Sequence, residues 1–164
     1  MIKNGVTILG LGNILMQDEG VGVYSANLLK DNYNFSPDIK IIDGGTTGTD
    51  LLPYFEESDK ILIIDAVNFE KDPGYIDVIE NDNILTTITA KISLHHLGLS
   101  DVLSLIKLLG ITPSEICLVG IQPVTMELGL DVSNEMKKFS DKILETVISK
   151  LSSWGISCEK KTGS

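Results

Sequence analysis

The chain has 164 residues, of which 43% are hydrophobic and 22% charged, and its formal net charge at pH 7 is -10. The length and composition predict one globular domain over residues 1–164. Nucleic acids and anionic membranes bind basic surfaces, so the charge argues against both as partners. No apolar run approaches the roughly 20 residues that span a bilayer, and the chain does not begin with a signal-peptide pattern, so we expect a cytoplasmic protein.

Apolar, glycine and acidic signals meet in VTILGLGNILMQDEGVGV, residues 6–23. Residues 6–9, which are β-branched or apolar, predict a buried strand, and two glycines then end it. Asp18 and Glu19 stand where a helix extending to residue 29 would begin, although Gly20 and Gly22 weaken that pattern. Ligands of open α/β sheets bind beyond the carboxyl ends of the strands, so this loop is a candidate site.

The next segments repeat the same plan. Residues 31–38 are polar and predict a loop, and residues 39–42 predict a short strand that ends in DGGTTG. Asp50 could cap a short helix that extends to residue 55. Residues 61–64, ILII, predict a strand buried on both faces, and this strand ends at Asp65.

The second half of the chain is less regular at first. A Pro-Gly turn precedes residues 75–79, an imperfectly alternating edge strand, and the short link to the preceding strand predicts a hairpin. Residues 81–91 have no clear pattern, and an extended segment or a loop is expected there. Ser100 resembles the N-cap of a helix that Gly110 ends, which places His95 and His96 in the loop before that helix.

An apolar run at residues 115–121 predicts the last buried strand, and the spacing of apolar residues over 133–153 predicts an amphipathic helix. Residues from about 155 to 164 read as a polar tail. Strands interleaved with helices predict an α/β fold with three layers, αβα, around a twisted, mostly parallel mixed sheet of about five strands.

The two cysteines, Cys117 and Cys158, have no CxxC spacing, and a disulfide scaffold is not expected in a reducing compartment. Cys117 lies inside an apolar run, so we interpret it as a small buried hydrophobic residue and not as a nucleophile. The chain also lacks the GxSxG elbow of serine hydrolases.

Three polar loops could meet at one side of the sheet: the loop with Asp18 and Glu19, the end of the strand at Asp65, and the loop with His95 and His96. Two carboxylates and an imidazole could bind a divalent ion such as nickel, zinc or manganese and leave positions open for water or substrate. Each residue also has a structural explanation, as a helix-terminal charge, a strand-end anchor or a loop histidine, and the residues alone leave both explanations open.

Dinucleotide binding is the main rival interpretation, because Gly10 and Gly12 form the start of a GxGxxG fingerprint. The third glycine of that fingerprint is replaced by Leu15, and Asp43 lies too far along the chain to be the ribose-binding acid. A nucleotide-binding oxidoreductase therefore ranks last. Asp43 could support the metal ligands or hold its glycine loop together, and we favour the structural role.

Five blocks follow one another as GLGNILMQDEGVGV, IIDGGTTGTDLL, ILIIDAV, KISLHHLGLSDVL and LVGIQP. Together they cover about residues 5–150 and resemble the hydrogenase maturation endopeptidase family, whose members remove the C-terminal extension from the large-subunit precursor of nickel-iron hydrogenases. The resemblance implies a twisted mixed sheet flanked by helices. It also implies that this precursor is the partner and supplies the nickel, for which other divalent metals could substitute.

Carried over from the family, the metal-binding and catalytic residues are Glu19, Asp65 and His95. His96 stands where the family reserves no histidine, and Asp18 precedes the ligand position and shapes the loop. A chaperone that binds metal or precursor without cleaving it is the alternative from a different functional class. The sequence predicts no oligomeric state.

Overall fold

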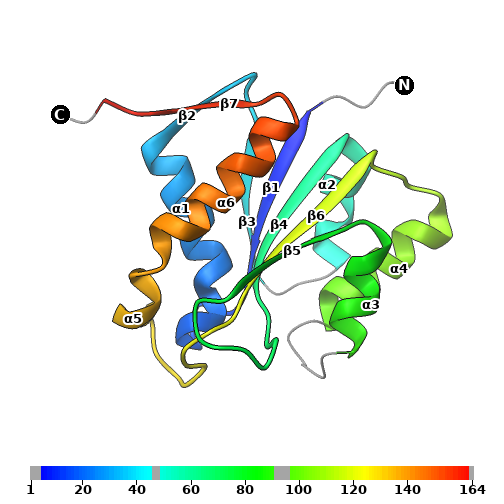
Figure 1. Cartoon of the computed structure of the whole chain (residues 1–164). Coiled ribbons are helices and arrows are strands. Elements are labelled where there is room, and N and C mark those ends of the chain that lie inside the picture. Colours follow the sequence, from blue (N-terminus) through cyan, green and yellow to red (C-terminus); the bar gives the residue numbers. More distant parts are fainter. Residues whose placement is uncertain (1–4, 46–48, 91–96, 163–164) are drawn as a thin grey trace.

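The computed structural model of the chain describes residues 5–45, 49–90 and 97–162. Its centre is a five-stranded sheet in the order β3-β1-β4-β6-β5 (Figure 1). Neighbouring strands are parallel except β5, which runs antiparallel to β6. The strands are β1 (Val6–Leu11), β3 (Lys40–Gly45), β4 (Lys60–Ala66), β5 (Ile76–Glu80) and β6 (Glu115–Ile121). The predicted mostly parallel mixed sheet is confirmed.

Helices cover both faces of the sheet, which confirms the predicted three layers (Figure 1). One face carries α1 (Val21–Asn32), α5 (Asn134–Lys137) and α6 (Ser140–Ser153), and a 3-10 turn, η1 (Gln17–Gly20), precedes α1. The other face carries the 3-10 turn η2 (Thr49–Leu51), α2 (Leu52–Glu57), α3 (Asp82–Ala90) and α4 (Leu97–Leu109). Among the described residues, no helix combines the length and apolar character that crossing a membrane requires.

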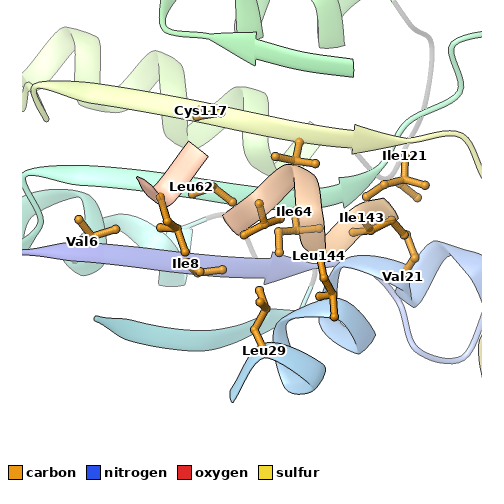
Figure 2. Packing of buried hydrophobic residues seen from close by; sticks show 14 of the residues in the cluster. Val6, Ile8, Val21, Leu29, Leu62, Ile64, Cys117, Ile121, Ile143 and Leu144 are labelled. Atoms are coloured by element: carbon orange, nitrogen blue, oxygen red, sulfur yellow. The ribbon is translucent and has the colours of Figure 1, made fainter. Parts of the chain in front are cut away.

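Strand β4 shows why the sequence builds this arrangement. Side chains alternate between the two faces of a strand, so Leu62 and Ile64 pack against α1 and α6 (Figure 2), whereas Ile61 and Ile63 pack against α2, α3 and α4. All four are fully buried. A central parallel strand is covered on both sides, and its sequence is therefore continuously apolar.

A second, two-stranded sheet joins β2 (Tyr33–Ser36) to β7 (Ser157–Lys160) in antiparallel register. The prediction of a loop over residues 31–38 was wrong here, and the polar tail contains a strand. The two strands are short, mostly polar and far apart in the chain. Only their pairing, in which Phe35 lies opposite Cys158, makes them strands, and no local pattern encodes that partner.

The predicted hairpin between β4 and β5 is also wrong. Strand β6 lies between them, parallel to β4 and antiparallel to β5. The chain reaches β6 from β5 through α3 and α4. Helix α3 occupies residues 82–90, so the expectation of an extended segment or a loop there was wrong. A strand as apolar as β4 needs buried neighbours along both edges, and β6 supplies the second one.

Several predicted helix boundaries shift. Helix α4 begins at Leu97, so Ser100 lies inside it and is not its N-cap, while Gly110 follows its last residue with a φ of +71° as expected. Leu51, and not Asp50, is the N-cap of α2, with no side-chain hydrogen bond. The predicted helix over 133–153 is divided into α5 and α6.

Candidate functional site

The carboxyl ends of four parallel strands form one edge of the sheet. Gly10 of β1 is in register with Asp43 of β3 and with Ile64 of β4, and Asp65 of β4 is in register with Gly120 of β6. Asp65 is 1% exposed. By strand alternation its side chain belongs to the same face as Ile61 and Ile63, so a carboxylate is buried at the edge where ligands of such sheets bind.

Gly22 brings the start of α1 against this edge. A Cβ atom added to Gly22 would lie 2.0 Å from the carbonyl oxygen of Ile64 and 2.4 Å from that of Leu11. Only a residue without a side chain permits this approach. Glu19, half-buried in η1 just before α1, is thereby held beside the end of β4. The glycine that weakened the helix pattern thus brings Glu19 and Asp65 to the same edge.

Asp18 has a structural role. Its carboxylate is fully buried and accepts hydrogen bonds from the amides of Val124 (3.0 Å), Thr125 (3.0 Å) and Ser133 (2.7 Å) and from the Ser133 hydroxyl (2.9 Å). These bonds join the loop after β1 to the segment between β6 and α5. The expectation that Asp18 shapes the loop is confirmed, and both oxygens of its carboxylate accept these hydrogen bonds.

Asp43 also has the structural role that the sequence predicted. Its Oδ1 accepts a hydrogen bond from the Gly45 amide at 3.2 Å, which closes a turn at the end of β3. The carbonyl of Gly45 in turn accepts from the Gly12 amide at 2.9 Å. The loops after β1 and β3 are therefore tied together beside the candidate site.

The predicted histidines, His95 and His96, lie outside the described residues. Within residues 5–45, 49–90 and 97–162, no group of three or more histidine, cysteine or acidic side chains has the arrangement of a metal site. Of the three predicted ligands, the structure describes Glu19 in η1 and Asp65 in β4, both at the carboxyl ends of the parallel strands. Helix α4 follows His95 in the chain, and its Leu99 packs on the face of the sheet to which Asp65 belongs.

One edge of the sheet thus carries Asp65 at the end of β4 and Glu19 on the turn before α1. The family described as hydrogenase maturation protease matches residues 23–150. The chain belongs to this family. The resemblance stated from the sequence is confirmed, and the protein is a maturation endopeptidase, which is a hydrolase.

Similar sequences and solved structures also point to the hydrogenase maturation protease family. The chain is 34% identical to hydrogenase expression/formation protein HupD of Rhodobacter capsulatus over 94% of this chain and 75% of the relative. It is also 34% identical to the hydrogenase 2 maturation protease of Escherichia coli, over 92% and 93%. The structure of the hydrogenase maturating endopeptidase HybD from E. coli superposes with a TM-score of 0.90 at 32% identity and covers 98% of this chain and 99% of that one.

In this maturation protease, Cys117 is a core residue. It is fully buried in β6, in register with Leu62, and belongs to the cluster under α1 and α6 (Figure 2). Burial raises the pKa of the Cys117 thiol to about 12, outweighing the opposite effect of the nearby Lys150 ammonium. A neutral, enclosed thiol is no nucleophile, which confirms the interpretation made from the sequence.

We predict that iodoacetamide at pH 8 modifies the native protein at Cys158, which is half-buried, and leaves Cys117 unmodified because its thiol is fully enclosed in the core. Mass spectrometry of tryptic peptides would locate the adduct, and urea-unfolded protein, labelled at both cysteines, is the control. Modification of native Cys117 at a rate similar to that of Cys158 would contradict this assignment.

The sequence reasoning missed that the segment between β6 and α5 holds the loop after β1 through Asp18. Ser133 serves both as the N-cap of α5, accepting from the Met136 amide at 3.2 Å, and as a donor to Asp18. A serine at the start of the predicted C-terminal helix was the available signal. Its contact with Asp18, 115 positions away, had no signal in the sequence.

Proposed function

We propose that the protein removes the C-terminal extension from the large-subunit precursor of a nickel-iron hydrogenase after nickel insertion, with Glu19, Asp65 and His95 contacting the nickel held by the precursor. The observation that carries the proposal is the position of Asp65, 1% exposed at the carboxyl end of β4 beside the turn that contains Glu19. Family membership supports it, and one solved relative is described as a NiFe hydrogenase maturation protease from Thermococcus kodakarensis.

The ligand chemistry supports a metal carried by the substrate. Carboxylate and imidazole groups are suitable ligands for nickel, and a cation is strongly attracted to a carboxylate in a poorly solvated place such as that of Asp65. The nickel, when bound, can polarise the scissile carbonyl or activate a water molecule. Glu19 and Asp65 would make cleavage conditional on metal insertion, because a precursor that carries the ion gains its attraction to their charges and a metal-free precursor does not. Zinc and manganese accept similar ligands and are the natural substitutes to compare.

The test is cleavage of a nickel-loaded large-subunit precursor, followed by mass spectrometry, with the metal-free precursor and the Glu19→Gln protein as controls. We expect loss of a C-terminal peptide only with the wild-type protein and the loaded precursor. Binding of a matched, loaded precursor without any cleavage would contradict the protease function and support the chaperone alternative.

A further inference from the structure

Two loops next to Glu19 expose large apolar side chains to solvent. The loop after β1 contributes Ile14 and Leu15, which are about half exposed, and the segment after β6 contributes Met126 together with Leu128 and Leu130, which are 80% and 83% exposed. We call these five residues the docking surface. Contiguous apolar side chains at the surface of a soluble protein mark interaction sites more often than isolated ones do.

The two loops are joined to each other, so the docking surface is ordered before any partner arrives. Met16 and Gly129 form a parallel β-bridge, the Gln17 amide donates to the Gly129 carbonyl at 3.3 Å, and the Gly129 amide donates to the Leu15 carbonyl at 3.0 Å. Gln17 adopts a left-handed φ of 47° to make this contact. The fully buried carboxylate of Asp18 also holds the segment after β6, by accepting hydrogen bonds from the amides of Val124 and Thr125. A surface held in this way loses little conformational entropy on binding.

The docking surface has a hollow of about 220 Å³, which lies next to the candidate site because Gly20, the residue after Glu19, lines it. Its apolar walls are Ile14, Val23, Tyr24, Leu130 and Val132. Pockets for small-molecule ligands usually occupy about 300–1,000 Å³, so this hollow better suits one side chain of a protein partner.

The two segments that form the docking surface carry acidic residues and no basic ones. Residues 4–29 and 108–136 contain no lysine or arginine. Glu127 is exposed between Met126 and Leu128, and the carboxylates of Asp43 and Asp131 line the hollow. Lys137, which approaches from α5, is paired with Asp131 at 2.7 Å. The complementary partner is an apolar segment flanked by lysine or arginine.

We propose that the docking surface binds an apolar segment of the hydrogenase large-subunit precursor that carries flanking basic residues, with one apolar side chain in the hollow. This inference rests on the proposed function and adds to it a contact with the precursor that does not depend on the metal. The segment after β6 lies beside the start of α1 (Figure 1), so one bound segment can extend from the docking surface to the carboxylates at the strand ends.

The experiment compares the Leu128→Asp/Leu130→Asp protein with the Leu108→Asp protein. Leu108, on the last turn of α4, is 83% exposed like Leu130 but lies away from both loops. For the docking variant we expect the Kd for metal-free precursor, measured by calorimetry, and the KM for nickel-loaded precursor to rise at least about tenfold, equivalent to about 1.4 kcal/mol, with kcat unchanged. Leu108→Asp should change neither value, and both proteins should melt at the wild-type temperature.

A second arm tests the charge. Glu127→Lys should weaken the binding of metal-free precursor, and raising the salt concentration should weaken wild-type binding more than Glu127→Lys binding. Normal cleavage by the wild-type protein, together with an unchanged Kd and KM in the docking variant, would overturn this inference and leave the proposed function intact. A wild-type dimer that the docking variant converts to monomers, with KM unchanged, would assign the surface to self-association. A wild-type protein that neither binds nor cleaves the precursor would overturn both proposals.

Discussion

Asp65→Asn is expected to lower kcat/KM for cleavage of the nickel-loaded precursor at least about a hundredfold, because in the proposed mechanism it removes a charged nickel ligand at a buried site, at a cost of several kcal/mol of transition-state stabilisation. The amide has the size of the carboxylate but lacks its charge, and Asp65 is 1% exposed, so little solvent replaces the lost interaction. The measurement is the rate of release of the C-terminal peptide under substrate-limited conditions, with the melting temperature recorded in parallel.

A matched control for this substitution is Asp59→Asn. Asp59 immediately precedes β4 at the opposite end of the strand from Asp65, and its carboxylate lies 3.7 Å from the Lys60 ammonium at the surface. We expect this protein to cleave at the wild-type rate, since exposed ion pairs contribute little. A second readout separates metal recognition from folding: we expect the wild-type protein to bind the loaded precursor more tightly than the metal-free one, and Asp65→Asn to show a smaller difference between the two. Full cleavage by Asp65→Asn would remove Asp65 from the site.

The strands of the central sheet could be predicted because a strand buried on both faces has a continuously apolar sequence. Strands β1, β4 and β6 could be recognised from their apolar runs. Helices cover both faces of each strand, so both sets of its side chains are mostly apolar. The order in which the strands pair was harder to predict. Nothing local shows that β6 lies between β4 and β5, or that β2 pairs with β7 across the length of the chain. Strand pairing depends on tertiary packing that alternation patterns do not encode.

The candidate site could be predicted only in part. A carboxylate after an apolar strand pointed to Asp65, and the acidic pair before α1 pointed to Glu19. The distinction between adjacent acids depended on knowing that Asp18 is buried against Ser133, which only the folded chain reveals. Gly22 was read as a weakness in a helix, because a sequence does not show what backbone approaches a glycine.

Asp18→Ala is expected to lower the free energy of unfolding by at least about 3 kcal/mol, the largest stability effect we predict for a single polar side chain of this protein. The substitution removes the acceptor of four hydrogen bonds from Val124, Thr125 and Ser133. Hydrogen bonds to a charged group contribute roughly 1.5–3 kcal/mol each, although the four share one carboxylate and do not add fully. Urea denaturation followed by circular dichroism gives the free energy.

Two comparison variants sharpen this test. Asp131→Ala removes a carboxylate of the same segment that is 68% exposed and pairs with Lys137 at the surface, and it should cost less than about 1 kcal/mol. Asp18→Asn keeps the shape but turns an NH2 group toward backbone amides that are themselves donors, so it should not restore stability. A loss below about 1 kcal/mol for Asp18→Ala would show that water replaces the carboxylate.

The same substitution should also separate the two halves of the proposed mechanism. Without the Asp18 carboxylate, the segment that carries Leu128 and Leu130 loses its attachment to the loop that carries Glu19. At a temperature where Asp18→Ala remains folded, we therefore expect faster limited proteolysis within residues 124–132 and a higher KM for the precursor. Preference for the nickel-loaded form should persist, because Asp65 belongs to β4 and its position does not depend on that segment.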